Sequence, residues 1–161
     1  MNERFRFRGY REGDLDALFR LDEVCFAEPF RFSQSEMRRF AQAQHALVVI
    51  AEEEHGELAG FCVVHVKAVK TGRVGYVVTL DVAPTMRRQG VARELMERME
   101  RQALKAGCGE IALHVFVQNE AAIRFYERMG YVYSHRADGF YGRGLDALVY
   151  RKALGRGDSV T

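Results

Sequence analysis

Two short segments hold the residues whose types and spacing suggest chemistry. The first, Arg87 to Arg93 (RRQGVAR), joins an apolar stretch to a helical pattern, and the second is Asn119 to Gly130 (NEAAIRFYERMG). A glycine among arginines at a helix start can bind anions, because free backbone N–H groups converge there with the positive end of the helix dipole. The first segment therefore predicts a phosphate-binding loop.

Each segment alone also fits an ordinary structural role. Neither GxxxxGK[ST] nor GxGxxG surrounds Gly90, so a loop for ATP or a dinucleotide is disfavoured, and a simple turn with solvated arginines is an alternative. Asn119 and Tyr126 are seven residues apart, about two helical turns, and so share one helix face. A capped helix with Phe125 and Tyr126 in the core explains that spacing equally well.

Hydrophobic periodicity predicts the elements that hold these segments in place. Alternation at Phe5 and Phe7 is typical of a half-buried strand, whereas Val91, Leu95 and Met99 recur at the spacing of one helix face. The expected order is β-α-α-β-β-β-α-β-α-β-β, a mixed α/β sheet with helices on both faces. In chain order we expect a strand near 5–7, a helix at 15–25, a short helix after a Ser33/Glu36 capping box, β-rich runs at 45–54, 57–69 and 74–82, a helix from 91 to 107, a strand at 110–117, a helix from Asn119 to Gly130, and paired strands from Tyr131 and from Leu145.

Composition limits the class of protein. A chain of 161 residues and 18.4 kDa suffices for one domain with its own core, expected at 1–154 with a polar tail at 155–161. The net charge of +2 and the scattered arginines disfavour nucleic acid and membrane surfaces as partners. No apolar run reaches the roughly 18 residues that span a bilayer, and the first residues lack a secretory pattern. Three cysteines without CxxC spacing favour the cytoplasm and disfavour a metal site.

The two motifs occur in a fixed order, separated by one expected helix and one expected strand. Together they resemble the GNAT superfamily of acetyl-CoA-dependent N-acetyltransferases, most strongly from Thr79 to Tyr131. The segments REGDLDALFRLDEVCFAEPF and GFYGRGLDALVYRKAL are similar to the RimI/Ard1 type, which acetylates protein N-termini. The resemblance implies a mostly antiparallel sheet with a splayed strand pair, and acetyl-CoA as co-substrate.

The resemblance also implies how the cofactor is bound. A bulge at Leu80, Asp81 and Val82 would splay the strand, and backbone groups there would hold the pantetheine arm. An N–H near Val82 would polarise the thioester carbonyl, on which negative charge develops during acyl transfer. The other positions that the resemblance assigns to the cofactor are Arg87, Arg88, Gln89, Gly90, Val91, Ala92 and Arg93 around the pyrophosphate, and Asn119 along the arm.

The resemblance also implies which residues transfer protons and which line the acceptor side. Tyr126 matches the general acid, and a phenol can protonate a departing thiolate. His114 stands where the RimI type has a glutamate; a neutral imidazole can take the proton of the amine directly or through water, but it can equally be an ordinary strand histidine. Phe30 and Tyr141 are expected to line the acceptor side.

These implications predict an enzyme that moves acetyl directly to a primary amine, with a protein or peptide N-terminal α-amine as the leading acceptor. A small amine of the polyamine or aminoglycoside type stays open. A non-catalytic CoA-binding module also stays open, because His114 replaces the expected glutamate. We expect a monomer or homodimer.

Overall fold

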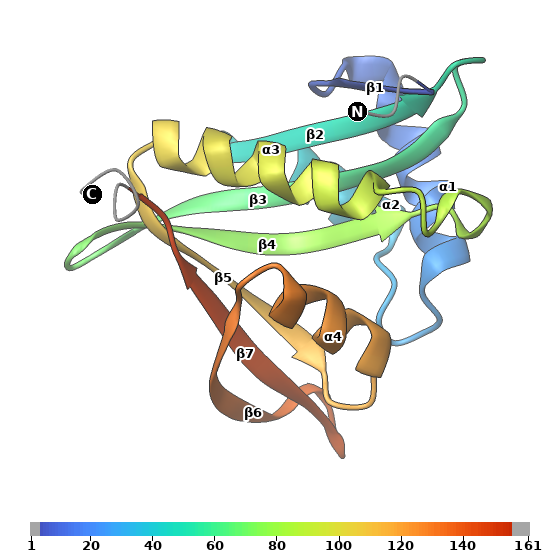
Figure 1. The fold of residues 1–161 in the computed structure, drawn as a ribbon. Coiled ribbons are helices and arrows are strands. Elements are labelled where there is room, and N and C mark those ends of the chain that lie inside the picture. The colour runs from blue at the N-terminus through green and yellow to red at the C-terminus, as the bar shows by residue number, and fades with distance from the viewer. Residues whose placement is uncertain (1–3, 156–161) are drawn as a thin grey trace.

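The centre of the molecule is one seven-stranded sheet in the order β1-β2-β3-β4-β5-β7-β6 (Figure 1). The computed structural model describes residues 4–155, so the tail beyond Gly155 that the sequence predicts lies outside the described residues. Only β4 and β5 pair in parallel, which confirms the expected mixed, mostly antiparallel sheet. The strands are β1 (Phe5–Arg8), β2 (Ala46–Glu53), β3 (Leu58–Val69), β4 (Gly72–Val82), β5 (Cys108–Phe116), β6 (Val132–Gly142) and β7 (Leu145–Ala153).

Helices cover both faces of this sheet, as expected (Figure 1). The helices α1 (Leu15–Cys25) and α2 (Gln34–Ala41) pack on one face, and α3 (Val91–Lys105) and α4 (Glu120–Arg128) on the other. The predicted capping box begins α2, where the Ser33 hydroxyl accepts from the Glu36 N–H and the Glu36 carboxylate accepts from the Ser33 N–H. Within residues 4–155, no helix is both long and apolar enough to cross a membrane.

The parallel strands β4 and β5 pair only over their first residues. Their register runs from Arg73 opposite Cys108 to Tyr76 opposite Ala112 and then stops. In Figure 1, β5 swings away from β4 and runs beside β7, with α4 over that part of the sheet. The facing edges of the two strands are therefore unpaired beyond Tyr76, which is the splayed pair that the sequence resemblance implied.

The bulge lies upstream of the position expected for it. We expected it at 80–82, but the register between β3 and β4 shifts where Val63 faces Thr79 and Val64 faces Val77, so Val78 is the extra residue. Further along, the two backbones approach closely, since a Cβ on Gly60 would lie 2.6 Å from the carbonyl oxygen of Asp81. Regular pairing is therefore kept at 80–82, and the irregularity falls where β4 has just lost β5 as a neighbour.

Replacement of Gly60 by alanine tests this close approach. The added methyl group must push β3 from β4, so we expect Gly60→Ala to lower the free energy of unfolding by about 1–3 kcal/mol. Gly109→Ala is the matched control, because a Cβ there meets nothing within 4 Å. Urea unfolding curves measure both, and equal stability of the two variants would contradict the close approach.

Candidate functional site

The loop before α3 has the backbone geometry of an anion site. Gly90, the N-cap of α3, has φ 83° and ψ 6°, and Arg88 has φ 64°, so both are left-handed. No side chain caps this helix, and its first intrahelical bond runs from the Glu94 N–H to the Gly90 oxygen. The N–H groups of residues 91–93 are therefore left without a capping partner at the positive end of the helix, which is where an anion binds.

Two of the predicted loop residues stabilise the loop itself. Arg87 turns back and donates its Nε–H to the Val82 oxygen at 3.1 Å. Gln89 accepts from the Arg4 guanidinium at 2.7 Å. The backbone is consequently the main anion-binding group that the loop offers, with nearby positive charge. The other predicted side chains are buried at Val91, half-buried at Ala92 and exposed at Arg88 and Arg93.

The free edge of β4 presents two peptide groups toward the splay. Ala83 donates its N–H to the Ala59 oxygen on β3 at 2.8 Å. Because peptide groups alternate in direction along a strand, those of Leu80 and Val82 point away from β3. In the described part of the chain, residues 4–155, no strand pairs with that side of β4 after Tyr76. This edge can accept an extended ligand as an additional strand.

Asp81 points elsewhere, although the sequence resemblance placed it with its neighbours. It sits opposite Phe61 of β3, so its peptide group faces that strand and not the splay. Its side chain is buried beside Asp22 and accepts a hydrogen bond from the Thr79 hydroxyl at 2.5 Å. Leu80 and Val82 are therefore the members of this trio that face the open edge.

Tyr126 and Asn119, the predicted residues of the second motif, both belong to α4. Asn119 caps the helix as expected, its Oδ1 accepting from the Ala122 N–H at 3.2 Å. The Tyr126 side chain is buried, and its ring packs against those of Phe125 and Tyr131. Burial raises the pKa of Tyr126, and the neighbouring Cys62 and Tyr141 raise it further. The phenol therefore keeps its proton over the physiological pH range and can serve as a donor.

His114 occupies β5 with one nitrogen bonded and one free. Its Nδ1 lies 2.9 Å from the Tyr76 hydroxyl, and its ring stacks on Phe140 with centroids 3.7 Å apart. Burial lowers the pKa of His114 below 6.5, and the nearby His135, Lys67 and Arg151 side chains lower it further. The imidazole is therefore neutral near pH 7. For Nε2 to accept a proton, Nδ1 must carry its hydrogen and donate it to the Tyr76 oxygen.

The sequence did not single out Tyr76. Its partnership with His114 arises from the register of β4 with β5, which places Tyr76 at the last paired position. Burial raises the pKa of Tyr76 to about 12, so it stays a neutral phenol beside the imidazole. In the sequence, Tyr76 is only a tyrosine in a β-rich run, and this does not reveal that it contacts His114, 38 residues away.

Four rings form an aromatic cluster beside His114: Phe30, Phe116, Phe140 and Tyr141. The ring centroids of Phe30 lie 4.8 Å from Phe116 and 5.0 Å from Tyr141, and Phe140 lies 4.9 Å from Tyr141. The structure thus brings together Phe30 and Tyr141, both expected on the acceptor side. Phe116 was not predicted as a member. Spacing was a usable signal for Phe116, because a residue two positions after His114 shares its side of the strand.

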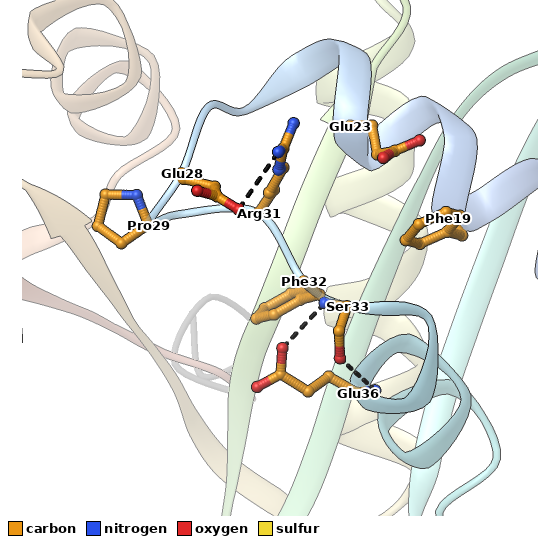
Figure 2. Close-up of a pocket in the computed structure, with 8 residues that line it drawn as sticks. All are labelled: Phe19, Glu23, Glu28, Pro29, Arg31, Phe32, Ser33 and Glu36. Atoms are coloured by element: carbon orange, nitrogen blue, oxygen red, sulfur yellow. Dashed lines mark hydrogen bonds and ion pairs between the residues drawn. The ribbon is translucent and has the colours of Figure 1, made fainter.

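The loop that carries Phe30, residues 26–33, joins α1 to α2 and is called here the α1–α2 loop. On its outer side is a hollow of about 480 Å³ (Figure 2). Figure 2 shows Glu28 paired with Arg31 at 3.3 Å, and Glu36 bonded to Ser33 at the start of α2. The residues lining the hollow are Phe19, Glu23, Glu28, Pro29, Arg31, Phe32, Ser33 and Glu36.

Residues 15–131, which contain α1 to α4 and both strands of the splayed pair, match the acetyltransferase (GNAT) family. The chain belongs to the GNAT acetyltransferase family. A curated relative, the N-alpha-acetyltransferase MAK3 of Arabidopsis thaliana, is 34% identical over 74 residues. That alignment covers 46% of this chain and 39% of the relative, so this GNAT chain matches less than half of the length of that protein.

Solved structures share the fold over nearly the whole GNAT chain. NAA60 of Arabidopsis thaliana in complex with a bisubstrate analogue has a TM-score of 0.82 at 24% identity, covering 94% of this chain and 98% of that chain. A mutant of the spermidine N-acetyltransferase SpeG of Vibrio cholerae has a TM-score of 0.77 at 20% identity, covering 98% and 99%. At these identities the likeness shows the fold alone, and a fold found in a spermidine enzyme does not identify the acceptor.

The stacked Phe140 ring gives a direct test of the electrostatics at His114. Replacing Phe140 by alanine admits water to the imidazole, so the pKa of His114 should rise toward 6.5 because the desolvation that lowers it is relieved. Tyr133→Ala, which removes another exposed aromatic ring from β6, is the control and should leave this pKa unchanged. NMR titration of the histidine ring resonances measures both. An unchanged pKa in Phe140→Ala would show that stacking does not set the state of His114.

Proposed function

We propose that this GNAT chain transfers the acetyl group of acetyl-CoA to a primary amine, and that the acceptor is the N-terminal α-amine of a peptide or protein. One observation supports this most: an uncapped helix start, an open strand edge and two groups suited to proton transfer occur around the splay of β4 and β5. Family membership supports acetyl transfer, and the match to an N-alpha-acetyltransferase supports the acceptor.

The donor side is matched to the chemistry of acetyl-CoA. The N–H groups of residues 91–93, with Arg88 nearby, suit the pyrophosphate. The amides of the pantetheine arm can pair with the Leu80 peptide group as an added strand, whereas the Val82 oxygen is already bonded to Arg87 Nε. The Val82 N–H then stabilises the oxygen of the tetrahedral intermediate. Asn119 bonds α4 through its oxygen, which leaves its NH₂ group for the arm.

The transfer needs one bond made, one broken and two proton movements. The amine nitrogen attacks the thioester carbon, the C–S bond breaks, and CoA leaves as a thiolate. His114 Nε2 takes the proton of the amine, directly or through a water, while its Nδ1–H donates to Tyr76. Tyr126 donates its proton to the departing sulfur. Burial keeps each group in the protonation state that this reaction requires, His114 neutral and Tyr126 protonated.

The aromatic cluster supports a peptide acceptor. Its rings offer an apolar surface for the first side chain of a peptide, and the Tyr141 hydroxyl offers a polar contact for its backbone. The cluster contains no carboxylate, whereas a polyamine site requires several. A polyamine acceptor is the second candidate, favoured by Glu23, Glu28 and Glu36 around the hollow in Figure 2.

The acceptor is tested by incubating the protein with acetyl-CoA and following the release of CoA. We expect turnover with peptides that have a free N-terminus and none with the same peptides blocked at the N-terminus. Turnover with spermidine or aminoglycosides alone would replace the peptide acceptor. Binding of acetyl-CoA without turnover of any amine would indicate a CoA-binding module.

The cytoplasmic location and the monomeric or homodimeric state that the sequence predicts stay predictions.

The roles of the two proton-transfer groups predict a separation of turnover from cofactor binding. Tyr126→Phe and His114→Ala should each lower kcat by about 10²- to 10⁴-fold, the usual range for loss of a general acid or base. The Kd for CoA should change little, because neither group is assigned to the phosphates. The control is Tyr133→Phe, which removes an exposed hydroxyl. Steady-state kinetics and calorimetry measure the two quantities, and wild-type kcat in Tyr126→Phe would eliminate the proposed acid.

The helix start before α3 predicts loss of cofactor binding in Gly90→Asp. The variant strains a left-handed backbone position and places a carboxylate where the pyrophosphate belongs, so the Kd for CoA should rise by about tenfold or more. Gly56→Asp is matched, since Gly56 has φ 89° against 83° for Gly90 and neither Cβ would meet an atom within 4 Å. Calorimetric titration with CoA should find only the Gly90 variant impaired; equal Kd values would remove this loop from the site.

A further inference from the structure

Two acidic side chains are buried between α1 and β4, and the proposed chemistry uses neither. Asp22 of α1 has no exposed surface, and Asp81 of β4 is 1% exposed. The Phe32 N–H donates to Asp22 Oδ2 at 2.7 Å, and the Thr79 hydroxyl donates to Asp81 Oδ1 at 2.5 Å. The remaining oxygens, Asp22 Oδ1 and Asp81 Oδ2, have no hydrogen-bond partner within residues 4–155. Unpartnered oxygens on two buried acids require an explanation.

A single proton satisfies both oxygens. The two carboxyl groups lie within hydrogen-bonding reach of each other, but two ionised carboxylates have no donor to share and repel in a dry interior. Burial raises the pKa of both groups, and the hydrogen bond with Asp22 and then its charge raise that of Asp81 further, which favours Asp81 as the group that carries the proton. An O–H on Asp81 can donate to Asp22, which would complete a chain from Thr79 to the backbone of Phe32.

We propose that Asp22 and Asp81 share one proton and thereby fix the α1–α2 loop against β4. The two residues are called the acid pair. The inference deepens the proposed function and rests on it, because this loop carries Phe30, a member of the aromatic cluster on the acceptor side. The anchored N–H of Phe32 is two residues from Phe30. The acid pair touches no reacting group, so both members are positioning residues.

The charged groups around the acid pair favour retention of the proton. Arg87 lowers the pKa of Asp81, whereas Glu23 of α1 and Glu36 of α2 raise that of Asp22. Two carboxylates therefore favour the protonated pair, and one guanidinium opposes it. The other titratable groups that face the pair have raised pKa values and are neutral at pH 7, namely Cys25 of α1, Cys62 of β3 and Tyr126 of α4.

The direction of the pH effect follows from the raised pKa of Asp81. The folded protein holds a proton that the unfolded chain has released, so the stability due to the pair is complete below the unfolded pKa and is lost as pH rises through the folded pKa. Above that pH, two facing negative charges break the chain to Phe32 and release the loop. The KM for the acceptor should then rise, while the KM for acetyl-CoA should not.

Asp81→Asn tests the pair because its amide N–H can donate to Asp22 without titrating. At neutral pH, its acceptor KM should stay near the wild-type value. Toward alkaline pH, the ratio of wild-type to variant acceptor KM should grow about fivefold or more, the lower limit for losing a hydrogen bond to a buried group. The wild type and the variant are compared at the same pH, so the ionisation of the acceptor amine affects both KM values equally. The control, Asp14→Asn, removes an acid that pairs with Arg8 instead and should follow the wild type.

The double variant adds a second test. In Asp22→Asn combined with Asp81→Asn, the oxygens must still accept from Phe32 and Thr79, so two NH₂ groups face each other. Each single variant keeps one donor opposite one acceptor. The double variant should therefore raise the acceptor KM by more than the product of the two single effects. Independent, multiplicative effects would overturn the shared proton.

Two readouts without substrate separate this proposal from the proposed function. Infrared spectra of the wild type at neutral pH should show a buried protonated carboxyl band that Asp81→Asn lacks and Asp14→Asn keeps. Amide exchange at Phe32 should become faster in the wild type than in Asp81→Asn as pH rises. Absence of the band, or identical exchange, overturns the acid pair whatever the acceptor is. Failure to turn over any amine while both readouts hold refutes the proposed function alone, and a flat ratio of acceptor KM values overturns the positioning role.

Discussion

Hydrogen bonding of the β4 backbone is the constraint from which the rest of the site follows. Peptide groups must find partners, and β4 has β3 on one side along its length but β5 on the other side only as far as Tyr76. The close approach at Gly60 keeps β3 and β4 together to the end of the strand. Leu80 and Val82 are thus left with peptide groups that face an unpaired edge, directly before the loop that begins α3. A ligand with amides at one end and phosphates at the other complements both features.

Burial sets the charge state of the groups around this edge. It raises the pKa of Tyr126 and of Asp81 and lowers that of His114, so burial favours the neutral form of each group. A neutral phenol donates a proton, a neutral imidazole accepts one, and a neutral carboxyl group can donate to a neighbouring acid. The same desolvation therefore serves the proton transfers and holds the α1–α2 loop.

Elements and caps were predictable from the sequence because they depend on local spacing. The order of strands and helices, the capping box at Ser33 and the cap at Asn119 all follow from residues a few positions apart. The position of the bulge was not predictable, because it depends on the register of β3 with β4. The same limit applies to Asp81, whose direction follows from strand register.

The site shows this division most clearly at His114. Its sequence position suggested a base, but the partner that orients it, Tyr76, belongs to another strand, and the Phe140 ring that stacks on it belongs to a hairpin later in the chain.

The most direct test of the account is amide hydrogen exchange with and without acetyl-CoA. Pairing of the pantetheine arm with the open edge predicts new protection at Leu80 and Val82, with Asp81 unchanged. Saturating acetyl-CoA that leaves the Leu80 and Val82 amides unprotected would contradict it.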